Sequence, residues 1–250
     1  AAARELCLEP HPITTQVAPR DGFAELLLDL AILASQLDRL ALEVRELSRT
    51  EIGEVYEAEE RIGSSAMPHK RNPVVAERIS GLAKVLRGLV LAALENIPLM
   101  HERDLTNSSS ERIVVPHALL TVDQMLEDAL KLLKVIRIDE EAARRNLEAT
   151  RGAIYSELLV TRLVEKGWPR LKAYSKVAEL VKSMKSGETL VDAVLRDPEL
   201  AEVLEPRELR EIASPGYATR AVKRIVERAL SYVESALSRE PAYECEGGIS

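Results

Sequence analysis

The sequence feature that most limits the possible folds is a run of apolar residues at helical spacing between about residues 21 and 50. The apolar side chains advance by three or four positions each time, and neither Pro nor Gly occurs in the run after Gly22. The pattern predicts one helix of roughly 30 residues, much longer than the mean globular helix of about 11 or 12. The stripe expected to face the core consists of Leu26, Leu30, Leu33, Leu37, Leu40, Val44 and Leu47.

Two further long helices are predicted downstream. One begins after Pro73 and ends before Pro98, with an expected core stripe of Val75, Ile79, Leu82, Leu86, Leu89 and Ala93. The other begins near Ser108, with an expected stripe of Leu119, Val122, Leu126, Leu130 and Leu133. Ser108 and Glu111 have capping-box spacing, and Pro116 predicts a kink. Three such helices with short connections predict a helical bundle. We expect it to assemble with partner subunits, since one chain rarely covers every apolar face of long helices.

The chain changes character after about Arg137. Helical segments become shorter, and Gly and Pro interrupt them more often, which predicts a second, smaller helical domain. We therefore expect an all-α protein with a long-helix domain at 1–137 and a C-terminal domain at 138–250 that ends in an irregular tail. The sequence contains no internal repeat and no convincing strand.

Composition narrows the functional classes. The formal net charge is −7, which makes general binding to nucleic acid or an anionic membrane unfavourable. A local cluster of arginines can still bind a phosphorylated small molecule. Aromatic residues are only 3% of the chain, so the core is expected to consist of Leu, Val, Ile and Ala. Lys, Arg and Glu are abundant while Gln and Asn are scarce, a bias that resembles thermophile proteins.

No signal peptide and no uninterrupted apolar run of membrane-spanning length is visible, so we expect a soluble, cytoplasmic protein. The two cysteines, Cys7 and Cys245, are interpreted as free thiols in a reducing cytoplasm. A disulfide between them is the alternative, because hyperthermophiles are an exception to the rarity of intracellular disulfides. Neither a metal nor an organic cofactor is implied, because there is no ligand cluster and no dinucleotide-binding motif.

The segment most indicative of chemistry is GSSAMPHKRNP at residues 63–73, between two predicted helices. It offers two adjacent hydroxyls, Ser64 and Ser65, and two cations, Lys70 and Arg71. Asn72 adds an amide donor just before Pro73, at an expected helix N-terminus. Donors and cations of this kind can hold a carboxylate or an oxyanion. By composition alone, a solvated basic loop followed by a helix start is an equally good interpretation.

This segment resembles the signature of the fumarase/aspartase superfamily, whose pattern is GSS-x-MP-x-K-x-NP. Three further features are similar to those of adenylosuccinate lyases: Glu77 after the signature, HERDLTNSSSER at 101–112, and TTQVAPRD at 14–21. Together the matches cover about residues 10 to 115. The resemblance implies a core of long helices, a homotetramer whose active sites combine residues from three subunits, and the release of fumarate from succinylated purine nucleotides by β-elimination.

The resemblance also implies roles for individual residues. Ser64 matches the catalytic base, although its neighbour Ser65 cannot be separated from it by sequence alone; Lys70 and Asn72 match groups that stabilise the doubly charged carboxylate. Glu77 matches a residue that orients a histidine, or is simply a first-turn acid favoured by the helix dipole. Met67 covers the substrate or merely packs. The remaining matches are to substrate contacts: Arg103, Ser108 and Arg112 to the nucleotide phosphate, Gln16 and Arg78 to other groups.

None of the four histidines, His11, His69, His101 and His117, matches the family's general acid. In family members that acid lies N-terminal to the signature, so we expect this chain to be part of a longer or split protein. Two alternatives stay open. One is another superfamily lyase or a cycloisomerase acting on carboxymuconate, against which Arg103 and Arg112 argue because that substrate has no phosphate. The other is a non-catalytic helical scaffold that lacks the acid.

Overall fold

The computed structural model describes residues 11–58, 72–101 and 103–238, and the chain divides into two compact units. The division falls between Ala143 and Arg144, whereas the sequence predicted a domain boundary between residues 137 and 138. Helices dominate both units, so the expected all-α class is confirmed.

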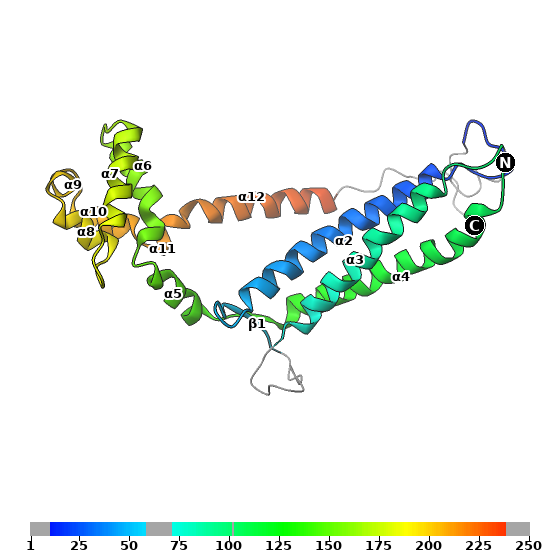
Figure 1. The fold of residues 1–250 in the computed structure, drawn as a ribbon, viewed down its shortest axis with the longest axis horizontal. Helices are drawn as coiled ribbons and strands as arrows, with labels where there is room; N and C mark the ends of the chain where they lie inside the picture. The colour runs from blue at the N-terminus through cyan, green and yellow to red at the C-terminus, as the bar shows by residue number, and fades with distance from the viewer. Residues whose placement is uncertain (1–10, 59–71, 102, 239–250) are drawn as a thin grey trace. The chain divides into compact units, whose positions relative to one another are not determined.

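Three long helices form the first unit: α2 (Asp21–Leu47), α3 (Val74–Glu95) and α4 (Thr106–Val135) (Figure 1). Two side-chain contacts establish their directions. Arg45, near the end of α2, donates to Oγ of Ser80, near the start of α3, at 3.1 Å. Asn96, which follows α3, donates to Oγ of Ser110, near the start of α4, at 3.1 Å. Therefore α2 and α4 run parallel to each other and antiparallel to α3.

The face of α2 that packs inside the unit matches the predicted stripe only in part: Val44 is buried, and Leu30, Leu37 and Leu47 pack against the core. Of that stripe, Leu26, Leu33 and Leu40 are exposed. The buried residues are mostly small: Ala24, Leu27, Ala31, Ala34, Ala41 and Val44. Both sets follow the same spacing of three and four residues, so periodicity alone does not choose between them. Small side chains let the helix backbones approach closely, and three of the predicted leucines are left outside.

Of the other two helices, α3 buries its predicted stripe and α4 mostly does not. The predicted stripe of α3 is confirmed, since Val75, Ile79, Leu86 and Ala93 are buried and Leu82 and Leu89 pack against the same core. In α4 only Val122 of the predicted stripe is buried, and Leu119, Leu126, Leu130 and Leu133 are exposed. The α4 core face is made instead by Val114, Ala118, Val122, Met125, Ala129 and Leu132.

The start of α4 also differs from the prediction. The helix begins at Thr106, its N-cap position is occupied by Leu105, and the expected capping box between Ser108 and Glu111 does not form. Asp104 instead accepts a hydrogen bond from the backbone N–H of Thr106 at 2.9 Å. The helix runs unbroken through Pro116, and the kink expected there stays a prediction.

Two short strands correct the expectation that the chain has none. β1 (Val55–Glu57) pairs antiparallel with β2 (Ile136–Ile138), and Glu57 lies opposite Ile136. A three-residue strand is too short for period-two alternation to be recognised in a sequence. The pairing joins the segment after α2 to the end of α4, because β2 directly follows that helix.

The second unit is a cluster of short helices. The elements after β2 are α5 (Glu140–Ala149), η1 (Ala153–Tyr155), α6 (Ser156–Glu165), α7 (Arg170–Lys182), α8 (Leu190–Arg196), α9 (Pro198–Val203), α10 (Pro206–Ile212), α11 (Pro215–Ala218) and α12 (Arg220–Leu237). The division between the units falls within α5. Ser214 accepts from the backbone N–H of Tyr217, so it caps the helix that begins at Pro215. In α12 the apolar side chains of Val222, Ile225, Val226, Leu230, Val233 and Leu237 are exposed.

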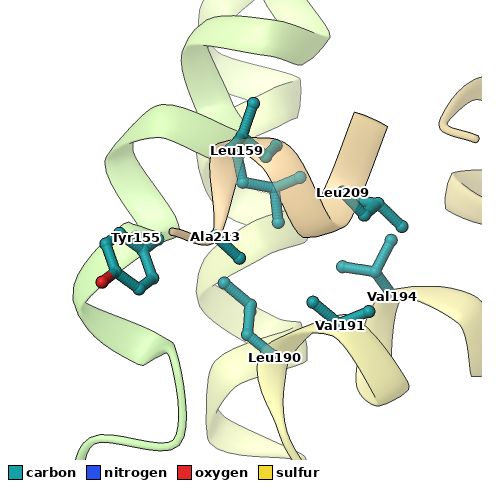
Figure 2. A pocket seen from close by; sticks show the side chains of 8 residues that line it. Tyr155, Leu159, Leu190, Val191, Val194, Leu209 and Ala213 are labelled. Carbon is teal, nitrogen blue, oxygen red and sulfur yellow. The ribbon is translucent and has the colours of Figure 1, made fainter. Parts of the chain in front are cut away.

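A small cavity lies in the core of the second unit. It measures about 10 Å³ and is lined by Tyr155, Leu159, Leu190, Val191, Val194, Leu209, Ile212 and Ala213. Figure 2 shows aliphatic side chains from several helices converging on it. A cavity of this size is at the lower limit for one water molecule and too small for a metabolite. It is a packing gap in the core and not a candidate site.

The gap makes Leu159 a sensitive position. We expect Leu159→Ala to lower the free energy of unfolding by about 2–5 kcal/mol, because it removes a buried side chain and enlarges an existing void. Urea denaturation followed by circular dichroism measures this. Leu171→Ala is the control, since Leu171 is 78% exposed. Equal effects of the two substitutions would contradict the packing described here.

Candidate active site

Three of the candidate residues lie at the start of α3. Asn72 precedes the helix and is half-buried, while Glu77 and Arg78 are exposed. The N-cap is Pro73, which has no side-chain acceptor. Its carbonyl accepts the backbone N–H of Glu77 at 2.9 Å, and the carbonyl of Asn72 accepts that of Val74 at 2.9 Å. These bonds attach the candidate residues rigidly to the helix start.

The N-terminus of α3 is already occupied by an anion of the protein itself. The carboxylate of Glu57 accepts the backbone N–H of Val75 at 3.1 Å and that of Ala76 at 3.0 Å. Both of these N–H groups are therefore already satisfied within the chain. A substrate carboxylate at this end needs side-chain donors instead.

Arg78 is held by a buried carboxylate from the neighbouring helix. Its guanidinium donates from Nε to Oδ2 of Asp128 in α4 at 2.6 Å, and from Nη2 to Oδ1 of the same residue. The Asp128 side chain is 3% exposed, and Gln124 also donates to it, at 3.2 Å. One edge of the Arg78 guanidinium therefore has a structural function. Its match to a family substrate contact stays a prediction.

A second group of candidates lies at the N-terminal ends of α2 and α4. Gln16 is exposed and precedes α2, and Arg103 is exposed and precedes α4. Ser108 and Arg112 are four residues apart on α4 and so share one face of it. Ser108 is half-buried and Arg112 is exposed. The geometry brings two guanidinium groups and a hydroxyl to the start of a long helix, which suits a phosphate.

An ion pair and a hydrogen-bonded carboxylate stabilise this end of the bundle. Nε of Arg20 lies 2.8 Å from Oε1 of Glu111, and both side chains are largely buried. Asn107, also buried, donates to the same Glu111 oxygen at 3.1 Å. Nearby, hydrogen bonds from the Thr106 hydroxyl and the Met100 backbone N–H lower the pKa of Asp104. Because Glu111 engages Arg20, it ties the start of α2 to the start of α4 and leaves Arg112 facing outward.

The two groups of candidates lie at opposite ends of the bundle within one chain. Asn72, Glu77 and Arg78 are at the start of α3, whereas Gln16, Arg103, Ser108 and Arg112 are beside its end. At a rise of 1.5 Å per residue, the 22 residues of α3 separate them by about 33 Å. One chain therefore does not bring together the residues that the sequence assigned to one site.

The remaining candidates, Ser64, Ser65, Met67 and Lys70, lie outside the described residues, as do Cys7 and Cys245. Within residues 11–58, 72–101 and 103–238, no group of three His, Cys, Asp or Glu side chains is arranged to hold a metal ion. None of the helices described there is long and apolar enough to cross a membrane.

Sequence reasoning missed Glu57 and Asp128. A proline at an N-cap indicates that the N–H groups of the next turn need an acceptor from elsewhere, but it does not say which residue provides it. Asp128 interrupts the apolar pattern of α4, which is a signal for a buried charge with a partner. The partner itself becomes apparent only in the packed bundle.

Comparisons with known proteins agree with the geometry. The model of the family described as "Lyase" matches residues 3–88, and that of "Adenylosuccinate lyase C-terminus" matches residues 152–229. An adenylosuccinate lyase from Methanothermobacter thermautotrophicus is 45% identical over 229 residues, which are 90% of this chain and 51% of that protein. The chain thus spans about half the length of the curated relatives it matches.

Two solved structures share the fold. A fumarate lyase from Mesorhizobium sp. BNC1 superposes with a TM-score of 0.80 and 26% identity, covering 92% of this chain and 51% of that one. A 3-carboxy-cis,cis-muconate lactonizing enzyme from Pseudomonas putida gives 0.78 and 28%, covering 90% and 50%. The fold is that of the fumarase/aspartase superfamily of lyases. Within that superfamily, the chain is similar over 90% of its length to adenylosuccinate lyases.

The pair formed by Arg78 and Asp128 predicts unequal costs for its two deletions. Arg78→Ala leaves the buried Asp128 carboxylate without its ion-pair partner, and we expect it to lower the free energy of unfolding by about 3–5 kcal/mol. Asp128→Ala costs less, because Arg78 is 40% exposed and can be hydrated. Chemical denaturation of both variants measures the difference. A larger cost for Asp128→Ala would show that hydration does not relieve the arginine.

Proposed function

We propose that this chain takes part in the β-elimination of fumarate from adenylosuccinate, which gives AMP, and from succinylaminoimidazole-carboxamide ribotide. The observation that carries the proposal is the segment GSSAMPHKRNP, followed by Glu77, in a chain 45% identical to an adenylosuccinate lyase. Arg103, Ser108 and Arg112 support a phosphorylated substrate. A purine biosynthetic enzyme of this kind acts in the cytoplasm and needs neither a metal nor an organic cofactor.

The proposed reaction begins with proton removal. Ser64, deprotonated to its alkoxide, takes a proton from Cβ of the succinyl group and so regains its hydroxyl, and the electron pair moves into the adjacent carboxylate. Lys70 and Asn72 stabilise the doubly charged carboxylate that results. The C–N bond then breaks, its electrons go to the leaving nitrogen, and an acid protonates that nitrogen. We assign the acid to the part of the protein that relatives possess and this chain does not span.

The phosphate end of the substrate is assigned to the second group of residues. Arg103 and Arg112 supply charge-assisted donors, and the hydroxyl of Ser108 adds a third donor. Gln16, at the same end of the bundle, is assigned to another polar group of the nucleotide. Ser65 and Met67 are assigned to contacts beside the reacting succinyl group. Glu77 is assigned to orienting a histidine, which its exposure at the start of α3 permits.

We propose a homotetramer with active sites shared between subunits. The 33 Å between the two groups, estimated from the helical rise over the 22 residues of α3, exceeds the length of a nucleotide, so a second copy has to supply one group. Exposed leucines of α2 and α4, including Leu26, Leu33, Leu126 and Leu130, offer apolar surface for assembly. Such surface on a monomer marks an interaction site.

A thermophilic source is also proposed. It is supported by the abundance of Lys, Arg and Glu and by ion pairs that share partners in the second unit. Lys176 lies 2.8 Å from Asp197 and 3.1 Å from Glu199, and Lys172 lies 2.6 Å from Glu199. Networks of this kind contribute more at high temperature than at 25 °C.

The central test is fumarate release from adenylosuccinate, measured by absorbance with the longest native form of the protein. We expect release by the parent and a fall in kcat of about 10²–10⁴ in Ser64→Ala, since general base catalysis contributes that much. Ser65→Ala is the matched control and should retain more activity. If Ser64→Ala stays fully active, the base is elsewhere. A parent that binds the nucleotide but releases no fumarate would favour the scaffold alternative.

The shared site has its own test. Ser64→Ala and Arg112→Ala should each have little activity alone, and reassembly of the two from mixed, dissociated subunits should restore part of it. Restoration is expected because some assembled sites receive an intact residue 64 from one copy and an intact residue 112 from another. Size-exclusion chromatography with light scattering gives the subunit number. A mixture no more active than its parts would contradict the sharing of sites.

Activity on 3-carboxymuconate in place of adenylosuccinate would support the cycloisomerase alternative. Such a substrate gives Arg103 and Arg112 no phosphate to bind. An Arg112→Ala variant with an unchanged KM would point the same way.

A further inference from the structure

The start of α3 is stabilised by a residue far away in the sequence. Backbone N–H groups at the second and third positions of a helix usually bond to the side chain of the N-cap residue. Here these positions are Val75 and Ala76, and the N-cap is Pro73, whose side chain accepts nothing. Glu57 replaces the missing cap with its carboxylate, from 18 and 19 positions upstream. A negative charge at this place also interacts favourably with the helix dipole.

The carboxylate of Glu57 is itself fixed in place. Its residue lies in β1, opposite Ile136 of β2. On one side the backbone N–H of Ala58 donates to the carbonyl of Val135 at 2.9 Å, and on the other that of Asp139 donates to the carbonyl of Glu54 at 2.8 Å. The end of α4 therefore determines where Glu57 stands. Through Glu57, it also determines where the first turn of α3 stands.

Three candidate residues depend on that first turn. Asn72 and Glu77 are joined to it by the backbone bonds at Val74 and Pro73, and Arg78 follows in the next position. Arg78 is bound in turn to Asp128 of α4. The Glu57 carboxylate binds backbone N–H groups of the turn, whereas the Asp128 carboxylate binds the side chain of Arg78. The two carboxylates therefore fix the helix start through different groups.

We propose that Glu57 is a positioning residue for the elimination, one that acts by holding the first turn of α3 and with it Asn72, Glu77 and Arg78. The inference rests on the proposed function. Glu57 does not contact the substrate. It sets the geometry of groups that interact with the reacting succinyl end, and it leaves alone the phosphate end, whose residues come from a second copy in the shared site.

This placement predicts a split between kinetic constants. Displacement of catalytic groups by about 1 Å can cost up to about 100-fold in rate. We expect Glu57→Ala to lower kcat by about 10- to 100-fold with little change in KM, because Arg103, Ser108 and Arg112 keep their places. Glu57→Gln should lie between Glu57→Ala and the parent, because its amide oxygen still accepts one of the two N–H groups.

Asp197→Ala provides the matched control. Asp197 is also a carboxylate that accepts two backbone N–H groups at a helix start, those of Glu199 at 3.1 Å and Leu200 at 3.2 Å. It belongs to the second unit and carries no candidate residue. We expect Asp197→Ala to lower the unfolding temperature while its kcat at 25 °C equals that of the parent.

The experiment combines fumarate release with amide hydrogen exchange, using the longest native form of the protein and adenylosuccinate. Exchange at Val75 and Ala76 should accelerate in Glu57→Ala while the middle of α3 stays protected. Unchanged exchange there would overturn the hydrogen bonds as the cause. Faster exchange with unchanged kcat would reduce Glu57 to a helix cap and overturn its positioning role, as would an equal loss of kcat in Asp197→Ala.

The proposed function and the role of Glu57 are contradicted by different results. A parent that releases no fumarate overturns the proposed function and any role of Glu57 in it, whatever the exchange data show. A parent that releases fumarate, with Glu57→Ala equally active, overturns the role of Glu57 alone. If Glu57→Ala does not fold, Glu57→Gln decides through the same two readouts, because it keeps the size and shape of the side chain.

Discussion

The close packing of α2, α3 and α4 through small side chains is the constraint on which the rest of the first unit depends. Alanines such as Ala34, Ala83 and Ala118 are fully buried where the helices meet. Close approach at these positions suits small side chains, and several larger apolar residues of α2 and α4, such as Leu33 and Leu130, are exposed. The same packing fixes the antiparallel order, and that order carries the two groups of candidate residues to opposite ends.

Charged contacts near the helix ends fix the register between the helices, which apolar packing alone does not determine. Apolar stripes allow neighbouring helices to slide by a turn at modest cost, whereas an ion pair between named residues specifies one register. Arg78 with Asp128 does this at the start of α3, and Arg20 with Glu111 does it at the starts of α2 and α4. Each pair joins an element of the candidate site to α4. The positions of both groups of candidate residues are therefore set relative to α4.

Much of this arrangement could be predicted from the sequence, and what could not has physical reasons. Helix positions follow from periodicity and prolines, and the signature segment indicates the proposed chemistry. Periodicity did not choose between Leu33 and Ala34 as the buried residue of α2, because both stripes have the same spacing. The predicted capping box at Ser108 was wrong, because the helix begins at Thr106 and the backbone N–H of Thr106 bonds to Asp104. The strands, Glu57 and the separation of the two groups depend on contacts between distant segments, which local patterns do not encode.

The dependence of α3 on Glu57 limits which segment of the chain can be transplanted as a working unit. The eleven residues of the signature end at a proline that cannot cap the helix it introduces. Transplanted alone into another scaffold, they would leave two backbone donors of the following helix without an acceptor. The smallest portable module therefore runs from β1 through the signature to the first turns of α3, and it needs a β2-like segment to hold Glu57 in place. In such a fold, a sequence motif is shorter than the structural segment that holds it in place.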